Sequence, residues 1–312
     1  MPRSRWTAQN IPDLTGRTAV VTGANSGIGT PTARELARHG ARVLLACRDP
    51  EKGKRALERL RAELPGADLE LVRLDLADLA SVRQAADEIT EITEGRLHLL
   101  VNNAGVMAVP LHRTVDGFET QFGTNHLGHF ALTGLLMRPL LAAESPRVVT
   151  VSSMAHRWGR IDFGNLNAEG TYRKWLAYGQ SKLANLLFTF ELDSRVRRAG
   201  VDLTAVAAHP GTSATNLPNV GHQMAGGGFF DGALGRISYL WAQSAEAGAL
   251  PTLRAATDPQ VVGGDYLGPL GPMEARGEPG WVSTTTAARD RETARRLWEV
   301  SEKLTGVTFP AF

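Results

Sequence analysis

The fold of this chain is decided by one stretch near its start, Thr18-Ala19-Val20-Val21-Thr22-Gly23-Ala24-Asn25-Ser26-Gly27-Ile28-Gly29. Thr18–Thr22 is β-branched and apolar, which is typical of a buried strand. Ile28–His39 has the apolar spacing of a helix, so the glycines fall on a strand-to-helix turn. Backbone N–H groups at such a turn can approach a phosphate closely, and the helix dipole favours the anion. We therefore predict a dinucleotide site that uses Gly23, Asn25, Ser26, Gly27, Ile28 and Gly29.

Strand-like and helix-like segments alternate after this unit. Strands are predicted at Arg42–Cys47, Leu69–Leu74, Leu97–Asn102, Arg147–Ser152, Val201–Ala208 and Gly263–Leu267. Helices are predicted at Pro50–Leu64, Ser81–Thr93 with Ser81 as N-cap, most of Gly117–Leu141, Leu176–Ala199 and Ala287–Leu304. Apolar strands separated by helices indicate a parallel sheet covered on both faces. We predict an α/β, doubly wound parallel sheet (a Rossmann fold) in a single domain over 1–312, with a substrate-binding loop at 212–240 after the sixth strand.

Composition narrows the possible partners. The chain has 312 residues, of which 43% are hydrophobic, and its formal net charge is +2, so no basic excess points to nucleic acid. Phe130–Ala143 is too short and too interrupted to cross a membrane. Cys47 is the single cysteine, which fits a cytoplasmic protein. His126 and His129 are three residues apart, but no further ligand completes a metal site, so we expect no metal.

The second informative pattern is Tyr178-Gly179-Gln180-Ser181-Lys182. Four residues on a helix are one turn, so the phenol and the ammonium can meet. Hydride transfer to a carbonyl leaves an alkoxide that needs a proton, and a nearby ammonium lowers the pKa of a phenol that supplies it. The strand before this helix ends in Ser152-Ser153, and only one of these hydroxyls can face the site because side chains alternate along a strand.

These motifs resemble the short-chain dehydrogenase/reductase family over about Leu14 to Leu304. The glycine spacing is Gly-x-x-x-Gly-x-Gly, and Pro31 departs from it in the first turn of the helix, where a missing N–H costs little. The similarity is greatest to the branch that holds retinol dehydrogenases, WW-domain-containing oxidoreductases and light-dependent protochlorophyllide reductase. The stretches that carry it are Leu45–Asp49, Thr124–Phe130 and Tyr178–Phe188.

The resemblance implies a role for each site residue. Asn125, Ser153, Tyr178 and Lys182 would be catalytic: Asn125 helps to hold a water, Ser153 (or else Ser152) binds the substrate oxygen, Tyr178 is the general acid/base, and Lys182 holds the nicotinamide ribose. The cofactor would also contact Asp75 and Leu76, then Asn102, Ala104 and Gly105. Pro210, Gly211 and Thr212 would flank the nicotinamide, with Thr215 as an alternative to Thr212.

The end of the second strand predicts the cofactor. The position that is acidic in NAD-binding relatives falls on Cys47, and Arg48 follows it. A guanidinium suits the 2′-phosphate, so we expect NADP(H) rather than NAD(H). The alternative is that Arg48 pairs with Asp49 in a solvated turn.

We therefore expect a soluble bacterial enzyme that interconverts a carbonyl and an alcohol on a small, lipophilic substrate. The long segment between Ser153 and Tyr178 carries Trp158, Phe163, Tyr172 and Trp175, which are predicted to line an apolar pocket. Two alternatives stay open: an NADP(H)-binding sensor or scaffold without chemistry, and an epimerase or C=C reductase on the same fold. A homo-oligomer could form through the helices in Gly117–Leu141 and Leu176–Ala199.

Overall fold

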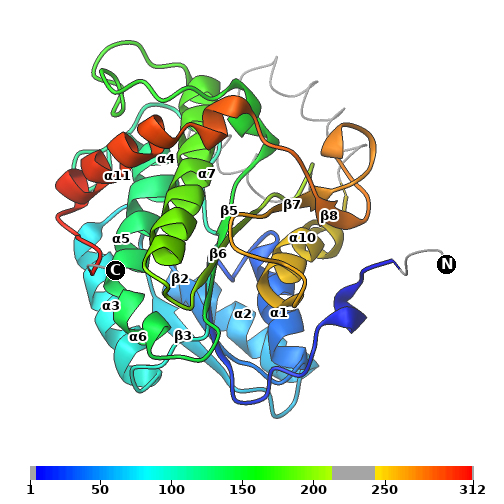
Figure 1. The fold of residues 1–312 in the computed structure, drawn as a ribbon. Coiled ribbons are helices and arrows are strands. Elements are labelled where there is room, and N and C mark those ends of the chain that lie inside the picture. The colour runs from blue at the N-terminus through cyan, green and yellow to red at the C-terminus, as the bar shows by residue number, and fades with distance from the viewer. Residues whose placement is uncertain (1–4, 213–242, 311–312) are drawn as a thin grey trace, which may run out of the picture.

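The structure, a computed structural model, describes residues 5–212 and 243–310 and is built on one eight-stranded sheet (Figure 1). Its strands lie in the order β3-β2-β1-β4-β5-β6-β7-β8, and among them only β8 runs antiparallel to its neighbour. They are β1 (Thr18–Thr22), β2 (Arg42–Cys47), β3 (Leu69–Arg73), β4 (Leu99–Asn102), β5 (Arg147–Val151), β6 (Thr204–Ala208), β7 (Tyr266–Pro269) and β8 (Pro279–Trp281). The order reverses between β1 and β4, so the predicted doubly wound α/β fold is confirmed.

Helices cover both faces of the sheet. One face carries α1 (Gly29–Arg38), α2 (Pro50–Glu63) and α10 (Ala245–Thr257). The other carries α3 (Leu79–Ile92), α5 (Gly128–Leu135) and α7 (Lys174–Arg198), with α11 (Arg291–Thr305) packed on α7. Successive strand residues alternate between the two cores: Val20 packs with one and Val21 with the other, as do Val148 and Val149. This double burial explains why the strands read as continuous apolar runs.

The segment predicted as mostly helical, Gly117–Leu141, is divided into short pieces. They are α4 (Thr120–Phe122), a π-helical turn η2 (Gly123–Leu127), α5 and α6 (Met137–Leu141). The turn η2 carries Asn125 and is fully buried. A π turn widens the helix by one residue and is frequent at functional sites, and here it places Asn125 next to the sheet edge where the site is expected.

One α-helix and one strand in the second half of the chain were not predicted from the sequence. Helix α10 has Pro251 in its interior, which argues against a helix in a sequence reading. Strand β8 has three residues, Pro279–Trp281, and its proline and glycine argue against a strand. Both lie after the sixth strand, where the chain supplies the last covering helix and the edge of the sheet.

The predicted N-cap Ser81 is wrong. Helix α3 begins at Leu79, and its cap is Asp78, whose carboxylate accepts from the N–H groups of Ala80 and Ser81. The Ser81 hydroxyl accepts instead from the backbone N–H of Asp75 at 3.0 Å. Asp78, three residues before Ser81, is therefore the N-cap residue. The Ser81 side chain instead stabilises the segment that follows β3.

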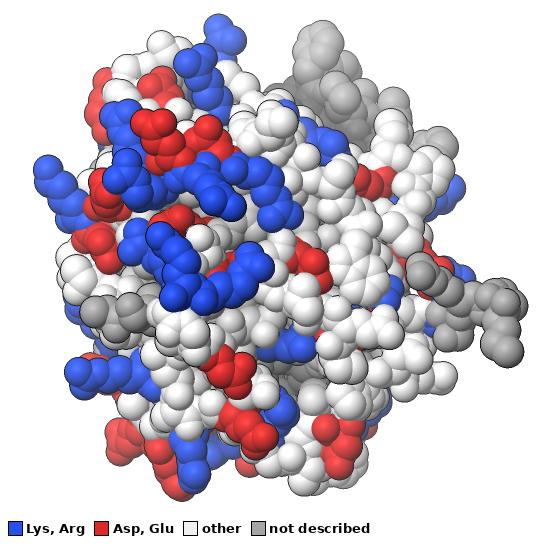
Figure 2. Space-filling model, in the orientation of Figure 1, with Lys and Arg blue, Asp and Glu red and all other residues white. Residues whose placement is uncertain are grey.

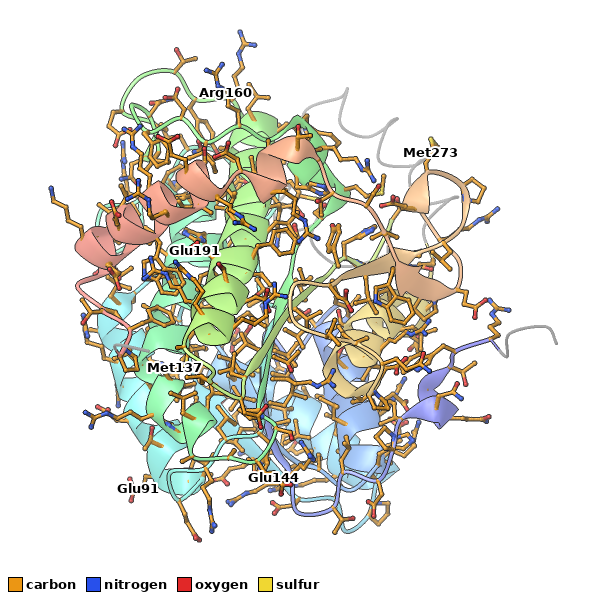
Figure 3. All side chains as sticks on the ribbon, viewed as in Figure 1. Glu91, Met137, Glu144, Arg160, Glu191 and Met273 are labelled. Atoms are coloured by element: carbon orange, nitrogen blue, oxygen red, sulfur yellow. The ribbon has the colours of Figure 1, made fainter. Side chains whose placement is uncertain are left out.

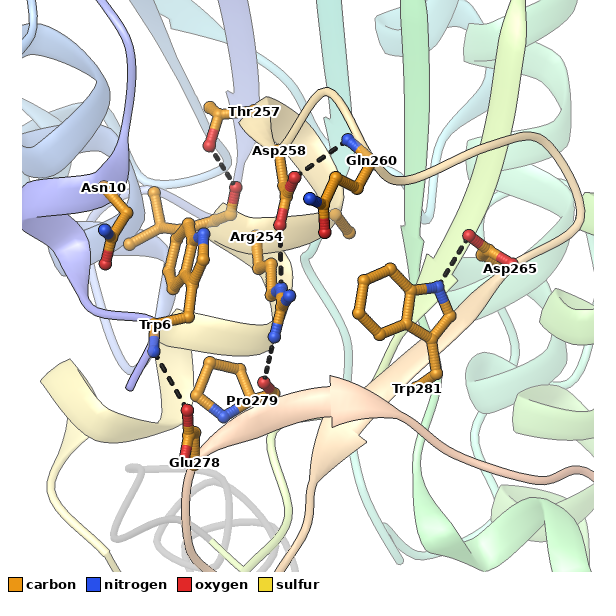
Figure 4. Close-up of polar contacts among 12 residues, drawn as sticks. Trp6, Asn10, Arg254, Thr257, Asp258, Gln260, Asp265, Glu278, Pro279 and Trp281 are labelled. Carbon is orange, nitrogen blue, oxygen red and sulfur yellow. Dashed lines mark hydrogen bonds and ion pairs between the residues drawn. The ribbon is translucent and has the colours of Figure 1, made fainter. Parts of the chain in front are cut away.

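The N-terminal segment is fastened to the edge of the sheet (Figure 4). The N–H of Trp6 donates to Glu278 at 3.0 Å, and the Arg254 guanidinium donates to the carbonyl of Pro279 at 2.7 Å. The same guanidinium lies over the Trp281 ring, 4.4 Å from its centroid. The start of the chain thus closes over β8 and α10, on the side of the molecule away from α3 and α5 (Figure 1).

On the face shown in Figure 2, Lys and Arg side chains gather at the upper left, with Asp and Glu side chains between and around them. No helix within residues 5–212 and 243–310 is long and apolar enough to cross a membrane. The same residues contain no cluster of three or more histidine, cysteine, aspartate or glutamate side chains that could hold a metal. Past Thr212, the predicted substrate loop at 212–240 lies outside the described residues, and so does Thr215.

Candidate active site

The glycine turn between β1 and α1 has the shape that a dinucleotide phosphate requires. Gly23 and Gly27 have φ angles of +67° and +55°, which favour glycine. A Cβ on Gly29 would lie 2.3 Å from the carbonyl oxygen of Gly23, so no side chain fits there. Helix α1 begins at Gly29 without a side-chain cap. The Gly29 N–H donates to the carbonyl of Ser26 at 3.2 Å and Pro31 has no N–H, so the N–H of Thr30 is the one that the first turn can offer to a ligand. The residues present therefore fit a pyrophosphate at the predicted turn.

A second turn, at the end of β4, is tied to this one through Thr22. The Thr22 hydroxyl accepts from the N–H groups of Asn103 and Ala104, both at 2.9 Å. The Asn103 side chain returns a hydrogen bond to the carbonyl of Thr22 at 2.7 Å. Since β1 and β4 flank the switch point of the sheet, these bonds hold open the crevice in which dinucleotides bind.

The remaining adenosine-side residues follow the ends of β3 and β4. The Asp75 carboxylate accepts from the N–H of Ala77 at 3.0 Å, and Leu76 is buried. Asn102 donates to the Thr133 hydroxyl at 2.9 Å, while its own Oδ1 is buried without a hydrogen-bond partner among the described residues. Asn102 thus bonds to α5, whereas the contact with the Thr22 turn is made by Asn103.

Cys47, the last residue of β2, and the two residues after it differ in burial and in their contacts. Cys47 is buried beneath the glycine turn, where the N–H groups of Ala24 and Asn25 contact its sulfur, and burial raises the pKa of its thiol to about 12. Arg48 is exposed, and no hydrogen bond or ion pair joins it to a described residue. Asp49 caps α2 and pairs with Lys52 at 3.6 Å, so the alternative of an Arg48–Asp49 pair is wrong.

Ser153, Tyr178 and Lys182 come together at the ends of β5 and the start of α7. The Ser153 hydroxyl lies close enough to the Tyr178 phenol to act on its pKa, so both hydroxyls face one point. The Lys182 ammonium lies 5.8 Å from the centre of the Tyr178 ring and donates to the carbonyl of Val151 at 3.2 Å. Ser152 points the other way, as strand alternation requires, and its hydroxyl donates to the carbonyl of Lys182 at 2.8 Å.

Burial controls the charge states of this group. It raises the pKa of Tyr178 to about 12, although the hydrogen bond from Ser153 acts in the opposite direction. It lowers the pKa of Lys182 to about 8. The expected lowering of the Tyr178 pKa is therefore absent from the chain by itself, because desolvation outweighs the ammonium 5.8 Å away. At neutral pH the site holds a protonated phenol beside a largely protonated lysine, which suits donation of a proton.

Asn125 makes hydrogen bonds to three other segments of the chain. Its side chain exchanges two hydrogen bonds with Val106, at 2.8 and 2.9 Å, and donates to the Ser181 hydroxyl at 2.9 Å. The backbone carbonyl oxygen of Asn125 lies 3.0 Å from Nδ1 of His129. Asn125 thus joins the loop after β4 to α7, and Gly105 lies against both it and Lys182: a Cβ there would be 3.0 Å from Asn125 Oδ1.

The two histidines of η2 and α5 are hydrogen-bonded core residues. His126 lies 2.9 Å from the Ser301 hydroxyl, and His129 lies 2.9 Å from the Thr22 hydroxyl. Burial lowers the pKa of His126 to about 3 and that of His129 to about 4, so both are neutral at physiological pH. His129 therefore links the Asn125 turn to the Thr22 turn, a connection that the sequence reading missed.

The turn after β6 completes the site. Pro210, Gly211 and Thr212 lie at its edge, with the N–H of Thr212 donating to the carbonyl of Ala275 at 2.7 Å. Thr212 also accepts from the N–H of Gln243 at 2.8 Å, so the turn is held on both sides. Besides Thr22 and His129, the sequence reading missed His209, Glu274 and Arg157, which contact this turn or its neighbours. His209 adjoins the recognisable Pro-Gly pair, but nothing in the sequence around Glu274 indicates a function.

The predicted aromatic pocket is wrong in part. Trp158 and Tyr172 line a cavity of about 320 Å³ together with Ala177 and Gln180. Gln180 is about 200° around α7 from Tyr178, so this cavity lies on the opposite face of the helix from the phenol. Phe163 packs under the Arg296 guanidinium at 4.0 Å. Only Trp175, whose ring is 6.5 Å from that of Tyr178, lies on the catalytic side of α7.

A doubly wound parallel sheet with a glycine turn at its switch point is the architecture of dinucleotide-binding proteins, and this chain has that architecture. The comparison with known families specifies it further. The model of the family described as short chain dehydrogenase matches residues 17–223. The chain belongs to the short-chain dehydrogenase/reductase family, in its retinol dehydrogenase-like branch.

Known relatives cover nearly the whole chain. Mouse retinol dehydrogenase 12 is 43% identical over 296 residues, which are 94% of this chain and 88% of that protein. The crystal structure of an uncharacterized protein from Mycobacterium paratuberculosis is 46% identical, with a TM-score of 0.81 over 98% of this chain and 100% of that one. A structure described as an NAD(P)-dependent gluconate 5-dehydrogenase from Beutenbergia cavernae, with bound NADP, is 28% identical, with a TM-score of 0.63 over 81% of this chain and 95% of that one.

Proposed function

We propose that this protein is an NADP(H)-dependent oxidoreductase that interconverts a carbonyl and an alcohol, with Tyr178 as general acid/base. Family membership supports oxidoreduction at a CH–OH group of a small molecule with a nicotinamide cofactor. The observation that carries the proposal is the position of the Tyr178 ring, 5.8 Å from the Lys182 ammonium and next to Ser153, on the sheet edge that holds the glycine turn.

In this mechanism the bound nicotinamide supplies the hydride, and the chain supplies binding and the proton. Ser153 and Tyr178 donate hydrogen bonds to the substrate oxygen and fix its position. Tyr178 then transfers its phenolic proton to that oxygen, which its high pKa permits at neutral pH because the phenol is protonated. Lys182 holds positive charge close to the phenolate that forms. Asn125 positions Lys182 through Gly105 and the start of α7.

The proposed preference for NADP(H) rests on Arg48. Its guanidinium is exposed at the end of β2 and engages no described partner, while Cys47 leaves no carboxylate to bind the ribose hydroxyls. The variant Arg48→Glu is expected to lower the ratio of kcat/KM for NADPH over NADH by about 10- to 100-fold, since one charge-assisted hydrogen bond contributes about 1.5–3 kcal/mol. Steady-state kinetics with both cofactors measure it. The variant Arg59→Glu, exposed on α2, is the charge-matched control, and an equal change in both variants would refute the assignment.

The proposed substrate is lipophilic. The relatives named retinol dehydrogenase suggest an apolar substrate class, and the half-exposed Trp175 supplies an apolar wall next to Tyr178. A panel of aldehydes and ketones of increasing chain length, followed by NADPH oxidation, is expected to show kcat/KM rising with apolar surface. The variant Trp175→Ala should raise KM about 10-fold for long substrates and leave short ones unchanged, because an aromatic contact contributes about 1–2 kcal/mol.

Trp158→Ala is the control for this panel, since Trp158 lines the cavity on the other face of α7. Faster turnover of small hydrophilic carbonyls than of long or aromatic ones would contradict the substrate class. NADPH binding without turnover of any carbonyl or alcohol would contradict the enzymatic proposal and favour a nucleotide sensor.

A further inference from the structure

The loop that joins β7 to β8 holds an acidic side chain against the active site. Met273 and Glu274 have φ angles of +52° and +54°, a left-handed conformation that residues other than glycine rarely adopt. Met273 points outward from this loop and is largely exposed (Figure 3). The turn formed by Met273 and Glu274 directs the Glu274 side chain inward. Two successive left-handed residues strain the backbone, and such strain persists where surrounding contacts stabilise the conformation.

The Glu274 carboxylate is held by two cationic or donor groups. Its Oε1 accepts from the Arg157 guanidinium at 2.6 Å, and its Oε2 lies 3.1 Å from Nε2 of the fully buried His209. Hydrogen bonds from His209 and Arg157 hold the pKa of this carboxyl below its ordinary value. Among residues 5–212 and 243–310, neither His209 Nε2 nor Glu274 Oε2 forms a hydrogen bond of full geometry. The contact between these two buried atoms is therefore an electrostatic one, at 3.1 Å.

The second nitrogen of His209 defines the tautomer. Its Nδ1 accepts from the backbone N–H of Gly211 at 3.2 Å, so the proton of a neutral ring must lie on Nε2, toward Glu274. Nε2 with its proton thus lies 3.1 Å from the Glu274 carboxylate, and Nδ1 accepts from the N–H of Gly211. The negative charge beside Nε2 favours this tautomer, in which Nδ1 is free to hold the turn that adjoins the proposed nicotinamide position.

Glu274 also connects this turn to the catalytic serine. Arg157 lies in the short helix η3 (Met154–Trp158), whose N-cap is Ser153: the Ser153 hydroxyl accepts from the N–H of Ala155 at 3.2 Å. The adjacent Ala275 carbonyl accepts from the N–H of Thr212 at 2.7 Å. A Cβ on Gly211 would lie 2.4 Å from that carbonyl, so the loop and the turn are in direct backbone contact. One loop residue therefore spans the two halves of the site.

The side chains below this network leave it little freedom to rearrange. The Tyr266 ring lies 5.2 Å from the His209 ring and 5.5 Å from the His156 ring, centroid to centroid. Nδ1 of His156 is 2.7 Å from the carbonyl of Ser153. His209 is thus packed on its face and fixed at both nitrogens.

We propose that Glu274 is a positioning residue for the nicotinamide: by fixing the tautomer of His209 it holds the Pro210–Thr212 turn in register with Ser153 and Tyr178. The expected effect on catalysis rests on the proposed function. The expected effect on the His209 tautomer and on the Pro210–Thr212 turn does not. Hydride transfer is sensitive to the separation of the reacting atoms, and a displacement of about 1 Å can lower the rate about 100-fold.

The test is the variant Glu274→Gln, which keeps the shape and removes the second acceptor. Its amide nitrogen must face either Arg157, opposing two donors, or His209, which forces the proton onto Nδ1 against the N–H of Gly211. We expect kcat to fall about 10- to 100-fold, with KM for the carbonyl changed less than threefold. Glu278→Gln is the matched control, because Glu278 lies on the same loop but accepts from Trp6 outside the site (Figure 4).

Two readouts do not depend on turnover. Nitrogen-15 NMR of the histidines should show His209 protonated at Nε2 in the wild type and altered in Glu274→Gln. The fluorescence enhancement of bound NADPH should fall in that variant, while the affinity for 2′,5′-ADP, which lacks the nicotinamide, stays within twofold. Should Glu274→Gln fail to fold, Arg157→Gln, at a half-exposed position, should give a smaller fall in both kcat and the fluorescence enhancement.

An unchanged His209 tautomer and NADPH fluorescence in folded Glu274→Gln would overturn the inference, and so would a fall in kcat that Glu278→Gln matches. A wild-type protein that binds NADPH but reduces no carbonyl would refute the proposed function alone, because the NMR and fluorescence comparisons would still decide the role of Glu274.

Discussion

Replacing Tyr178 with phenylalanine is expected to lower kcat/KM for carbonyl reduction by about 10²- to 10⁴-fold, the range that a positioned general acid contributes. The variant removes one hydroxyl and leaves the ring, which is packed against Trp175 and lies beside Lys182. Because the phenol is 6% exposed and its pKa is raised to about 12, no solvent base replaces it readily at the substrate oxygen. The measurement is NADPH oxidation with wild type and variant side by side, together with the dissociation constant of NADPH, which should change less than threefold.

Tyr172→Phe is the control for the loss of a tyrosine hydroxyl. The Tyr172 hydroxyl donates to the carbonyl of Val109 at 2.6 Å, on the other side of α7 from the catalytic group. Its removal should cost about 1 kcal/mol of stability and leave kcat unchanged. If Tyr178→Phe kept more than a tenth of the wild-type rate, or if Tyr172→Phe lost as much, Tyr178 would not be the proton donor.

The sequence predicted the fold and the contact between distant motifs because each of these follows from local chemistry. Strands buried on two faces must be apolar throughout, and a glycine turn before a helix has few other uses. The pair Tyr178 and Lys182 could be recognised because helical spacing alone places them together, and strand alternation correctly separated Ser153 from Ser152.

The parts that the sequence did not predict depend on contacts between distant segments. Glu274 meets His209 and Arg157 across 65 and 117 positions of sequence, and no local pattern encodes such a meeting. The side chain of Asn125 in the π turn is held by Val106 and Ser181, which lie far from it in the sequence. The cavity lined by Trp158 is a second example. The aromatic residues between Ser153 and Tyr178 predicted a pocket, but the face of α7 on which it lies follows from the three-dimensional fold.

The pKa of Tyr178 illustrates how packing changes the chemistry expected from a motif. Spacing predicts that Lys182 favours the phenolate, yet burial dominates in the chain itself and keeps the phenol protonated. In the proposed mechanism, the positive charge of an oxidised nicotinamide would have to add to that of Lys182 for the phenolate to form in the alcohol-oxidising direction. The motif identifies the two titratable groups, Tyr178 and Lys182. Their burial determines the direction in which the pKa of each group is shifted.

Gly29→Ala is expected to abolish tight cofactor binding and to destabilise the fold. The new Cβ would lie 2.3 Å from the carbonyl oxygen of Gly23 and 2.7 Å from the side-chain nitrogen of Asn103, both held by the turns that flank the switch point. Relief requires the glycine turn and the turn after β4 to separate. Overpacking of this kind costs about 1–3 kcal/mol, and displacement of the N–H groups should weaken NADPH binding at least 10-fold. Thermal unfolding and NADPH titration measure the two effects.

Gly170→Ala separates this effect from the general cost of replacing a glycine. Its Cβ would have one neighbour, the Asn165 side chain at 3.6 Å, which is an ordinary contact, and its φ angle is not left-handed. That variant should bind NADPH as the wild type does, with a stability change within about 0.5 kcal/mol. Wild-type affinity in folded Gly29→Ala would mean that the phosphates do not approach this turn, and the cofactor would then have to bind elsewhere along the carboxyl edge of the sheet.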